Sequence, residues 1–169
     1  SSMSFQSQFS HYDTKNSMDT KVYFTEKFLT EDECFDLIVK YKNKLETSEV
    51  RGGAVKKHIR NSKTFMFHDS DLCEKFQHEK MEFQLTEYVK DCFYNWHVDY
   101  YDTKKYVRKT SYSVLLNDDF DGGKLEFELS GIVDMSIGDS VSFSPHLRHQ
   151  VNPITSGIRY SLDAWELTI

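Results

Sequence analysis

The chain has 169 residues, the size of a single globular domain. Its 21 Lys and Arg against 27 Asp and Glu give a net charge of −6, which disfavours a surface that follows nucleic-acid phosphates. A hydrophobic fraction of 38%, with 15% aromatic residues, is enough for a core, and no stretch reaches the ~20 consecutive apolar residues of a membrane span. We therefore expect one soluble domain that binds neither nucleic acid nor membrane.

The three cysteines, Cys34, Cys73 and Cys92, are odd in number and lie far apart, without the close pairs typical of zinc or redox motifs. We expect them to be reduced thiols of the core. The N-terminus lacks a basic region followed by an apolar stretch and a cleavage site. A cytoplasmic location is therefore expected.

The first predicted element is a helix that follows a polar N-terminal segment. Residues 1–20 are polar and weakly periodic, so we expect partial disorder there and a single domain over residues 21–169. Thr30 followed by Glu33 is a capping-box signal. Apolar residues then recur at helical spacing, which predicts a helix over residues 30–47.

The next stretch combines a basic cluster, a strand and a second predicted helix. We interpret the cluster over residues 56–60 as a charged loop, with an anion-binding role as the alternative. Residues 64–67 are typical of a strand. Apolar residues from Met81 to Cys92 recur at i, i+4, i+7 and i+11, which predicts a helix over residues 71–93.

Beyond residue 93 the helical period gives way to short alternating apolar runs broken by Gly and Asp, which is typical of β structure. Many short strands at this spacing indicate a sandwich or jelly roll. Helices first and strands afterwards predict an α+β domain in which two helices cover a β-sheet. The predicted strands cover residues 94–100, 109–117, 123–129, 132–137, 140–145, 148–152 and 158–167.

A possible metal site begins in this half. His97 and Asp99 lie two apart on a predicted strand, so both side chains leave the same face. One metal ion can take an imidazole and a carboxylate from one side and a third ligand from another strand. His149, which opens a predicted strand, is the favoured third ligand, and His146 is the weaker candidate.

The last predicted strand carries a possible anion site. Arg159 and Ser161 also lie two apart and therefore share a face. A guanidinium holds a carboxylate through two parallel hydrogen bonds, and a neighbouring hydroxyl adds a third. A buried Arg needs an acidic partner, which is either a ligand carboxylate or, as the alternative, the side chain of Asp163.

Together these residues resemble the iron(II)- and 2-oxoglutarate-dependent oxygenases, specifically the prolyl 4-hydroxylase-like branch. The resemblance extends from about residue 21 to the C-terminus. It includes the leading helix and an Arg-x-Ser motif before a strand. The segments that carry it are Phe28-Leu29-Thr30-Glu31-Asp32-Glu33-Cys34, Arg60-Asn61-Ser62, His97-Val98-Asp99, Leu116-Asn117, Gly122-Gly123, His149 with Pro153 and Gly157, and Arg159-Tyr160-Ser161.

The resemblance implies a double-stranded β-helix, or jelly roll, with two N-terminal supporting helices. It implies Fe(II) held by His97, Asp99 and His149, with 2-oxoglutarate and O2 as cosubstrates and ascorbate as a reductant. The implied reaction is hydroxylation of a C–H bond coupled to decarboxylation of 2-oxoglutarate to succinate.

The resemblance also implies how 2-oxoglutarate is held. Arg159 matches the position that pairs with the far carboxylate of 2-oxoglutarate, and Ser161 matches a hydroxyl near it. Tyr94 matches an aromatic residue that lines the same pocket, although an ordinary strand aromatic is the alternative.

The substrate is less well determined than the reaction. The branch implies a prolyl residue of a peptide or protein, and a free amino acid or another small molecule is the alternative. Specificity is expected to come from the loops over residues 48–62 and 100–108, the second of which is either a cover for the pocket or an exposed loop. A non-catalytic jelly-roll module that binds zinc or a small ligand is a further alternative, because two His and an Asp also hold zinc.

Overall fold

The first helix begins where its capping signal predicts. The structure is a computed structural model that describes residues 18–48 and 59–168. Helix α2 (Glu31–Tyr41) is preceded by Thr30, whose Oγ1 accepts from the Glu33 amide at 3.1 Å, while Glu33 Oε1 accepts from the Thr30 amide at 2.8 Å. The helix is shorter than predicted because a 3-10 turn, η2 (Lys42–Lys44), and a short strand, β2 (Glu46–Thr47), replace its last part.

The prediction of a second helix over residues 71–93 was wrong. Only α3 (Ser70–Phe76) is helical, and Gln77 ends it in the left-handed conformation at φ 58°. The chain then forms strand β5 (Met81–Tyr88), which lies inside a sheet between two partners. Met81, Leu85 and Tyr88 of this strand fall at spacings of four and three, so its pattern was mistaken for a helical period.

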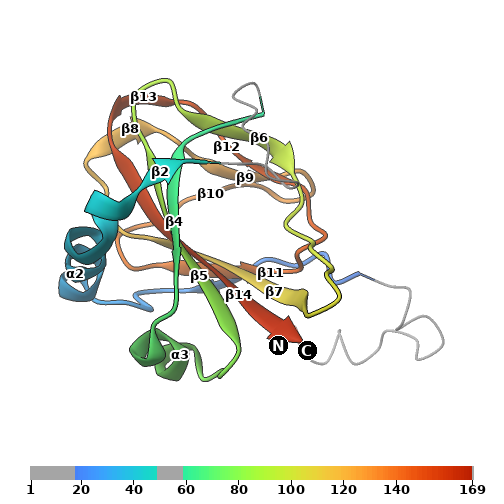
Figure 1. Ribbon diagram of the computed structural model, residues 1–169. Helices are drawn as coiled ribbons and strands as arrows, with labels where there is room; N and C mark the ends of the chain where they lie inside the picture. Colours follow the sequence, from blue (N-terminus) through green and yellow to red (C-terminus); the bar gives the residue numbers. More distant parts are fainter. Residues whose placement is uncertain (1–17, 49–58, 169) are drawn as a thin grey trace.

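A seven-stranded antiparallel sheet forms one layer of the molecule (Figure 1). Its central strand is the ten-residue β14, which pairs with β5 on one side and β7 on the other. In spatial order the strands are β1 (Tyr23–Thr25), β11 (Ser140–Phe143), β7 (Val107–Leu115), β14 (Arg159–Thr168), β5 (Met81–Tyr88), β4 (Lys63–Phe67) and β2 (Glu46–Thr47).

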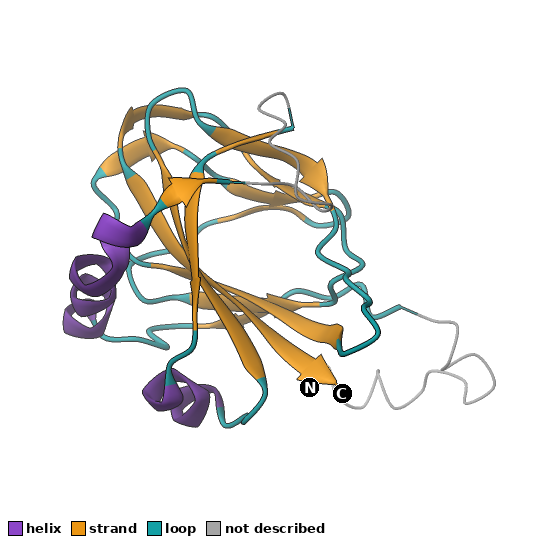
Figure 2. Cartoon of the chain, viewed as in Figure 1, coloured by secondary structure: helices purple, strands orange, loops and turns teal. Residues whose placement is uncertain are grey.

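A five-stranded sheet faces the first one, and a small two-stranded sheet lies at one end (Figure 2). The strands predicted from residue 94 onwards are confirmed to within a few residues. The five-stranded sheet runs β10 (Gly131–Val133), β9 (Leu125–Phe127), β12 (His149–Val151), β6 (Phe93–His97) and β3 (Arg60–Asn61), and the small sheet pairs β13 (Ile154–Gly157) with β8 (Phe120–Gly122).

The apolar residues form two cores that hold these layers together. One lies between the helices and the seven-stranded sheet, where Cys34 and Leu37 of α2 and Leu72 of α3 pack with Phe83 and Leu162. The other fills part of the space between the two sheets. Its buried members are Tyr88, Cys92, Leu125, Phe127, Val141, Phe143, Leu147, Val151 and Ile154. The predicted fold, a jelly roll with two supporting helices on one sheet, is confirmed.

Several expectations concern other parts of the chain. The three cysteines are free thiols; Cys34 and Cys92 are buried, and Cys73 is half-buried. Residues 1–17, and most of the loop over residues 48–62 with the basic residues 56–58, lie outside the described residues. In the two described stretches, no helix is long and apolar enough to cross a membrane.

Candidate active site

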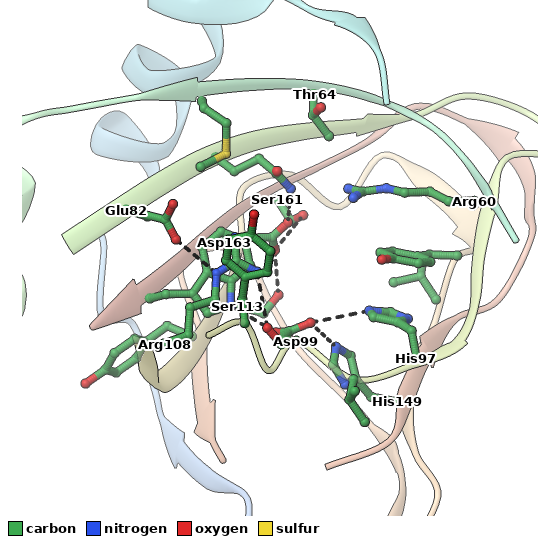
Figure 3. A pocket seen from close by; sticks show the side chains of 18 of the residues that line it. Arg60, Thr64, Glu82, His97, Asp99, Arg108, Ser113, His149, Ser161 and Asp163 are labelled. Carbon is green, nitrogen blue, oxygen red and sulfur yellow. Dashed lines mark hydrogen bonds and ion pairs between the residues drawn. The ribbon is translucent and has the colours of Figure 1, made fainter. Parts of the chain in front are cut away.

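A cavity of about 680 Å³ opens between the two sheets (Figure 3). Its floor is the inward face of the seven-stranded sheet, where β14 contributes Arg159, Ser161, Asp163 and Trp165 at alternate positions. The opposite wall comes from the five-stranded sheet. Residues that are far apart in sequence therefore meet in one polar chamber.

The predicted metal ligands lie together in this cavity. One side-chain ligand atom from each of His97, Asp99 and His149 falls within 4.8 Å of the others. Asp99 Oδ1 is 3.5 Å from Nε2 of His97 and 3.3 Å from Nε2 of His149. The register of β12 on β6 pairs His149 directly with His97, which brings the two imidazoles to the same place.

Asp99 reaches the cluster from a loop rather than from the strand. Strand β6 ends at His97, so the prediction that both residues lie on a strand over residues 94–100 was wrong. The backbone N–H of Asp99 donates to the Pro145 carbonyl at 2.8 Å, which fixes this loop against the segment that follows β11. This anchor, and not the strand, brings the carboxylate to the two imidazoles.

Neighbouring groups orient each of the three side chains. Nδ1 of His97 lies 2.7 Å from the Asn95 carbonyl and Nδ1 of His149 lies 2.9 Å from the Leu147 carbonyl, so each ring directs Nε2 to the centre. A carbonyl at Nδ1 requires a proton there and leaves Nε2 as an electron-pair donor. Both imidazoles are therefore prepared to bind a metal ion.

Two donors hold the carboxylate of Asp99 from behind. Its Oδ2 accepts from Ser111 Oγ at 2.8 Å and from Trp165 Nε1 at 3.1 Å, while Oδ1 faces the histidines. Ser111 is on β7 and Trp165 is on β14, directly opposite it in the sheet register. The carboxylate thus presents one oxygen to the metal position and has the other engaged by protein.

The electrostatics of the cluster keep the carboxylate charged. Burial acts to raise the pKa of Asp99, but the adjacent His149 and His97 outweigh it and hold that pKa well below its usual range. Burial, followed by the neighbouring His149, lowers the pKa of His97. Burial acts in the same direction on His149, but the charge of Asp99 outweighs it and the pKa of His149 is raised.

The weaker third-ligand candidate, His146, is placed elsewhere. Its side chain is exposed and its ring stacks on Tyr100 with centroids 4.1 Å apart. It does not belong to the group of ligand atoms that His149 joins. Among the described residues, the preference for His149 over His146 therefore agrees with the geometry.

Arg159 is a buried cation with an unused donor. It is 3% exposed, and its guanidinium lies 5.7 Å from the ring centroid of Tyr88 and 6.0 Å from that of Phe120. Its Nε has no hydrogen-bond partner among the described residues. Burial lowers the pKa of this guanidinium, which reflects the free energy of keeping a charge away from water. An unpaired donor at this depth is typical of a site that an anion completes.

Asp163, the alternative partner for Arg159, forms no ion pair with it within the described stretches. Instead its carboxylate accepts from neutral groups. These are Thr86 Oγ1 at 2.7 Å, Gln84 Nε2 at 3.3 Å, Ser161 Oγ at 3.4 Å and Ser113 Oγ at 3.5 Å. No acidic side chain among the described residues therefore forms an ion pair with Arg159, although the charge of Asp163 acts to raise its pKa.

Tyr94 lies against the metal cluster. Its ring stacks on His97 with centroids 3.4 Å apart and an interplanar angle of 4°, and it lines the cavity. Burial raises the pKa of the phenol, followed by opposing contributions from nearby charges. Tyr94 is thus more than an ordinary strand aromatic, because its stacking fixes the plane of one imidazole.

Sequence reasoning missed the ion pair that fixes the segment over residues 100–108. Arg108 Nε lies 2.9 Å from Glu82 Oε1, and the guanidinium covers the Trp165 ring at 3.7 Å. Tyr106 donates to the other oxygen of Glu82 at 2.9 Å. Because Tyr100, Tyr101, Tyr106 and Arg108 line the cavity, this segment forms part of its wall. A pair separated by 26 positions gives no local sequence signal.

Comparison with known proteins gives a family match over residues 83–166, to the model described as the 2OG-Fe(II) oxygenase superfamily. The matched region begins in β5 and ends in β14, so it contains all three clustered residues. No match was found among curated protein sequences.

Solved structures share the fold at low sequence identity. A prolyl-4-hydroxylase from Pseudomonas putida has a TM-score of 0.72 at 20% identity, over 93% of this chain and 96% of that one. The viral collagen prolyl hydroxylase of Paramecium Bursaria Chlorella virus-1, in its 2OG complex, has a TM-score of 0.69 at 21% identity, over 91% and 100%. A prolyl hydroxylase from Trichoplax adhaerens, in complex with a hypoxia inducible factor peptide fragment, has a TM-score of 0.68 at 14% identity, over 87% and 83%.

Proposed function

The chain belongs to the 2OG-Fe(II) oxygenase superfamily, and on that premise we propose that it hydroxylates a prolyl residue of a peptide or protein. The observation that carries the substrate proposal is an aromatic wall beside the metal ligands. Tyr100, Tyr101, Tyr106 and Trp165 line the same cavity as the three clustered residues. Aromatic grooves accept the compact, apolar proline ring, which loses little conformational freedom on binding.

The residues fit the two groups that this family uses. Two imidazoles and one carboxylate that converge on one point are a donor set for Fe(II) that leaves further coordination positions open. The buried Arg159, with its unpaired Nε, fits the far carboxylate of 2-oxoglutarate. When bound, iron and 2-oxoglutarate supply the activation of dioxygen, with release of succinate and carbon dioxide, that C–H hydroxylation requires.

The protein's own contribution is to bind and orient. In this proposal Arg159 pairs with the far carboxylate of 2-oxoglutarate, Ser161 lies beside it, and Tyr94 forms the pocket wall next to His97. The Ser161 hydroxyl donates to Asp163 over a long 3.4 Å contact, so rotation to a ligand carboxylate sacrifices little. Arg159 and Ser161 lie at alternate positions of β14, so both side chains face the cavity.

In this proposal the wall over residues 100–108 shields the reacting position. The Glu82–Arg108 pair joins this segment to β5, and Arg108 stacks on Trp165, whose Nε1 donates to Asp99. A fixed wall beside the metal ligands would limit the access of water to the bound groups. The combination of this wall with the buried Arg159 supports an enzyme over the non-catalytic module considered from the sequence.

The structural neighbours support the peptide substrate by analogy of fold. The Pseudomonas putida and viral proteins are named as prolyl hydroxylases, and the Trichoplax adhaerens protein is in complex with a peptide fragment. A free amino acid is the remaining candidate, because the same cavity admits a smaller ligand.

The test is a coupled assay on the purified chain. Protein is mixed with Fe(II), 2-oxoglutarate and ascorbate together with a panel of proline-containing peptides, and succinate and a peptide mass gain of one oxygen are measured. We expect both products in equal amounts with at least one peptide. Product from free L-proline and not from peptides would assign the smaller substrate. An absence of succinate with every substrate, from protein that binds Mn(II) and 2-oxoglutarate, would refute catalysis.

A further inference from the structure

A second buried guanidinium, that of Arg60, faces the cavity. Arg60 lies on β3 at the edge of the five-stranded sheet, is 8% exposed and lines the cavity wall. Figure 3 shows its side chain pointing inward from the side of His97, toward the row that contains Ser161 and Asp163. The Arg-x-Ser motif at residues 60–62 therefore contributes a cation to the active-site chamber.

Two contacts fix the direction of this side chain. Arg60 Nε donates to Ser62 Oγ at 2.9 Å, and the guanidinium lies over the Tyr94 ring, 4.3 Å from its centroid. Tyr94 in turn stacks on His97. The guanidinium is thus separated from a metal ligand by a single aromatic ring, which places it beside the reacting position.

No acidic side chain neutralises Arg60 within residues 18–48 and 59–168. The ion pairs there do not include it, and its one side-chain hydrogen bond is to the neutral Ser62. A guanidinium has five N–H donors, so the donors that face the cavity are available to a ligand. A cation at this depth is costly unless an anion accompanies it.

Among the described residues, the other buried charges of the chamber are engaged, and the exposed Glu46 at its edge forms no ion pair with Arg60. Glu82 pairs with Arg108, Asp163 accepts from neutral donors, and Asp99 faces the metal position. In the proposed function, 2-oxoglutarate brings one carboxylate to the metal and one to Arg159. Arg60 is then the cation for which the cosubstrate supplies no anion.

We propose that Arg60 binds a carboxylate of the primary substrate and so selects an acidic substrate. This inference rests on the proposed function, because it assigns Arg159 to 2-oxoglutarate. The carboxylate belongs either to the reacting amino acid itself, as a free or C-terminal residue, or to an acidic side chain beside the reacting residue in a peptide. Both sources present the same planar acceptor to the guanidinium fork.

Binding to protein loaded with Mn(II) and saturating 2-oxoglutarate tests the proposal without turnover. The first probe pair is N-acetyl-L-proline and N-acetyl-L-prolinamide, which differ only in the carboxylate. The second pair is an end-blocked heptapeptide with a central proline flanked by Glu or by Gln. Broadening of ligand NMR lines by the paramagnetic Mn(II) gives the affinity and shows that the ligand lies near the metal.

We expect the acidic member of at least one pair to bind roughly tenfold more tightly, the scale of one hydrogen bond between charged groups. Arg60→Gln should reduce this ratio to about one while leaving 2-oxoglutarate affinity unchanged. Arg60→Lys keeps the positive charge but not the forked geometry of the guanidinium, so it should retain part of the preference. This variant also provides the test if Arg60→Gln fails to fold. Lys63→Gln removes an exposed cation outside the cavity from the same segment and should leave the ratio unchanged.

The two probe pairs identify the source of the carboxylate. A preference for N-acetyl-L-proline alone assigns the reacting amino acid, and a preference for the Glu peptide alone assigns a neighbouring side chain. Equal binding within both pairs overturns the inference, as does a loss of 2-oxoglutarate binding in Arg60→Gln. If the carboxylate preference holds but no prolyl peptide is hydroxylated, the prolyl substrate fails and the role of Arg60 stands.

Discussion

The two donors behind Asp99 lead to a quantitative prediction about metal affinity. Ser111→Ala removes the hydrogen bond of 2.8 Å to Asp99 Oδ2, and Trp165→Phe removes the one of 3.1 Å while keeping an aromatic ring beneath Arg108. A hydrogen bond to a charged group contributes about 1.5–3 kcal/mol. Since about 1.4 kcal/mol is a factor of ten in affinity, each variant should bind the metal roughly 10–100-fold more weakly.

The assay is a calorimetric or fluorescence titration with Mn(II), performed on each variant after its thermal unfolding has been recorded. Ser113→Ala is the matched control, because Ser113 lies two residues along the same strand and its hydroxyl contacts Asp163 instead of Asp99. We expect its metal affinity to equal that of the original chain. The reasoning is refuted if Ser111→Ala and Trp165→Phe, both folded, bind Mn(II) as tightly as the control.

Three further predictions follow from the geometry. His149→Ala should abolish Mn(II) binding and His146→Ala should leave it nearly intact, as measured by the same titration; the reverse result would reassign the ligand. Gly123→Ala should lower stability in urea by about 1–3 kcal/mol and weaken 2-oxoglutarate binding, because a Cβ at φ +61° would lie 2.2 Å from Ile154 and 3.0 Å from Arg159; unchanged values would contradict this. The thiol of Cys34, whose pKa burial raises to about 11, should resist a disulfide reagent at pH 8 and react in urea; rapid labelling of Cys34 itself in the folded protein, distinguished from the half-buried Cys73 by peptide mass, would contradict its burial.

The metal ligands were predictable because their signal is local. His97 and Asp99 lie two positions apart, and His149 opens a recognisable strand, so side-chain type and spacing identified the group that the structure brings together. The supporting donors Ser111 and Trp165 carry no such signal. Their role depends on the pairing of β7 with β14, which sets residues 54 positions apart opposite each other, and such register is a property of the tertiary fold.

The error over residues 71–93 has a related origin. In β5, Phe83 and Leu85 face the helices, while Glu82, Gln84 and Thr86 alternate with them. A solvated strand face would give the same alternation, but here the polar face lines a cavity. Met81 and Tyr88, at the two ends of the strand, lie four and three positions from Leu85, and this spacing favoured the prediction of a helix.

Two glycine-containing segments outside the main predicted strands also proved to pair. Residues 118–123 and 152–157 contain β8 and β13, which pair with each other as the small sheet. Glycines with positive φ at Gly122 and Gly157 produced the turn pattern, and both lie where a Cβ would meet the backbone of the opposite segment. Glycine is used both in reverse turns and where two segments of the backbone pack closely together. Composition alone therefore does not distinguish a turn from a pair of closely packed strands.

Side chains along β14 point alternately into the core and into the cavity, so substitutions at the two sets of positions have different consequences. Leu162 and Ala164 are fully buried in the core beneath the helices, while Ser161 and Asp163 face the cavity. Substitutions on the cavity face can therefore change ligand preference with little effect on core packing. A one-residue insertion or deletion within the strand would exchange the two faces and destroy both at once. Adaptation of this scaffold to a new substrate is consequently expected to proceed by point substitution at alternate positions, with the strand's length held constant.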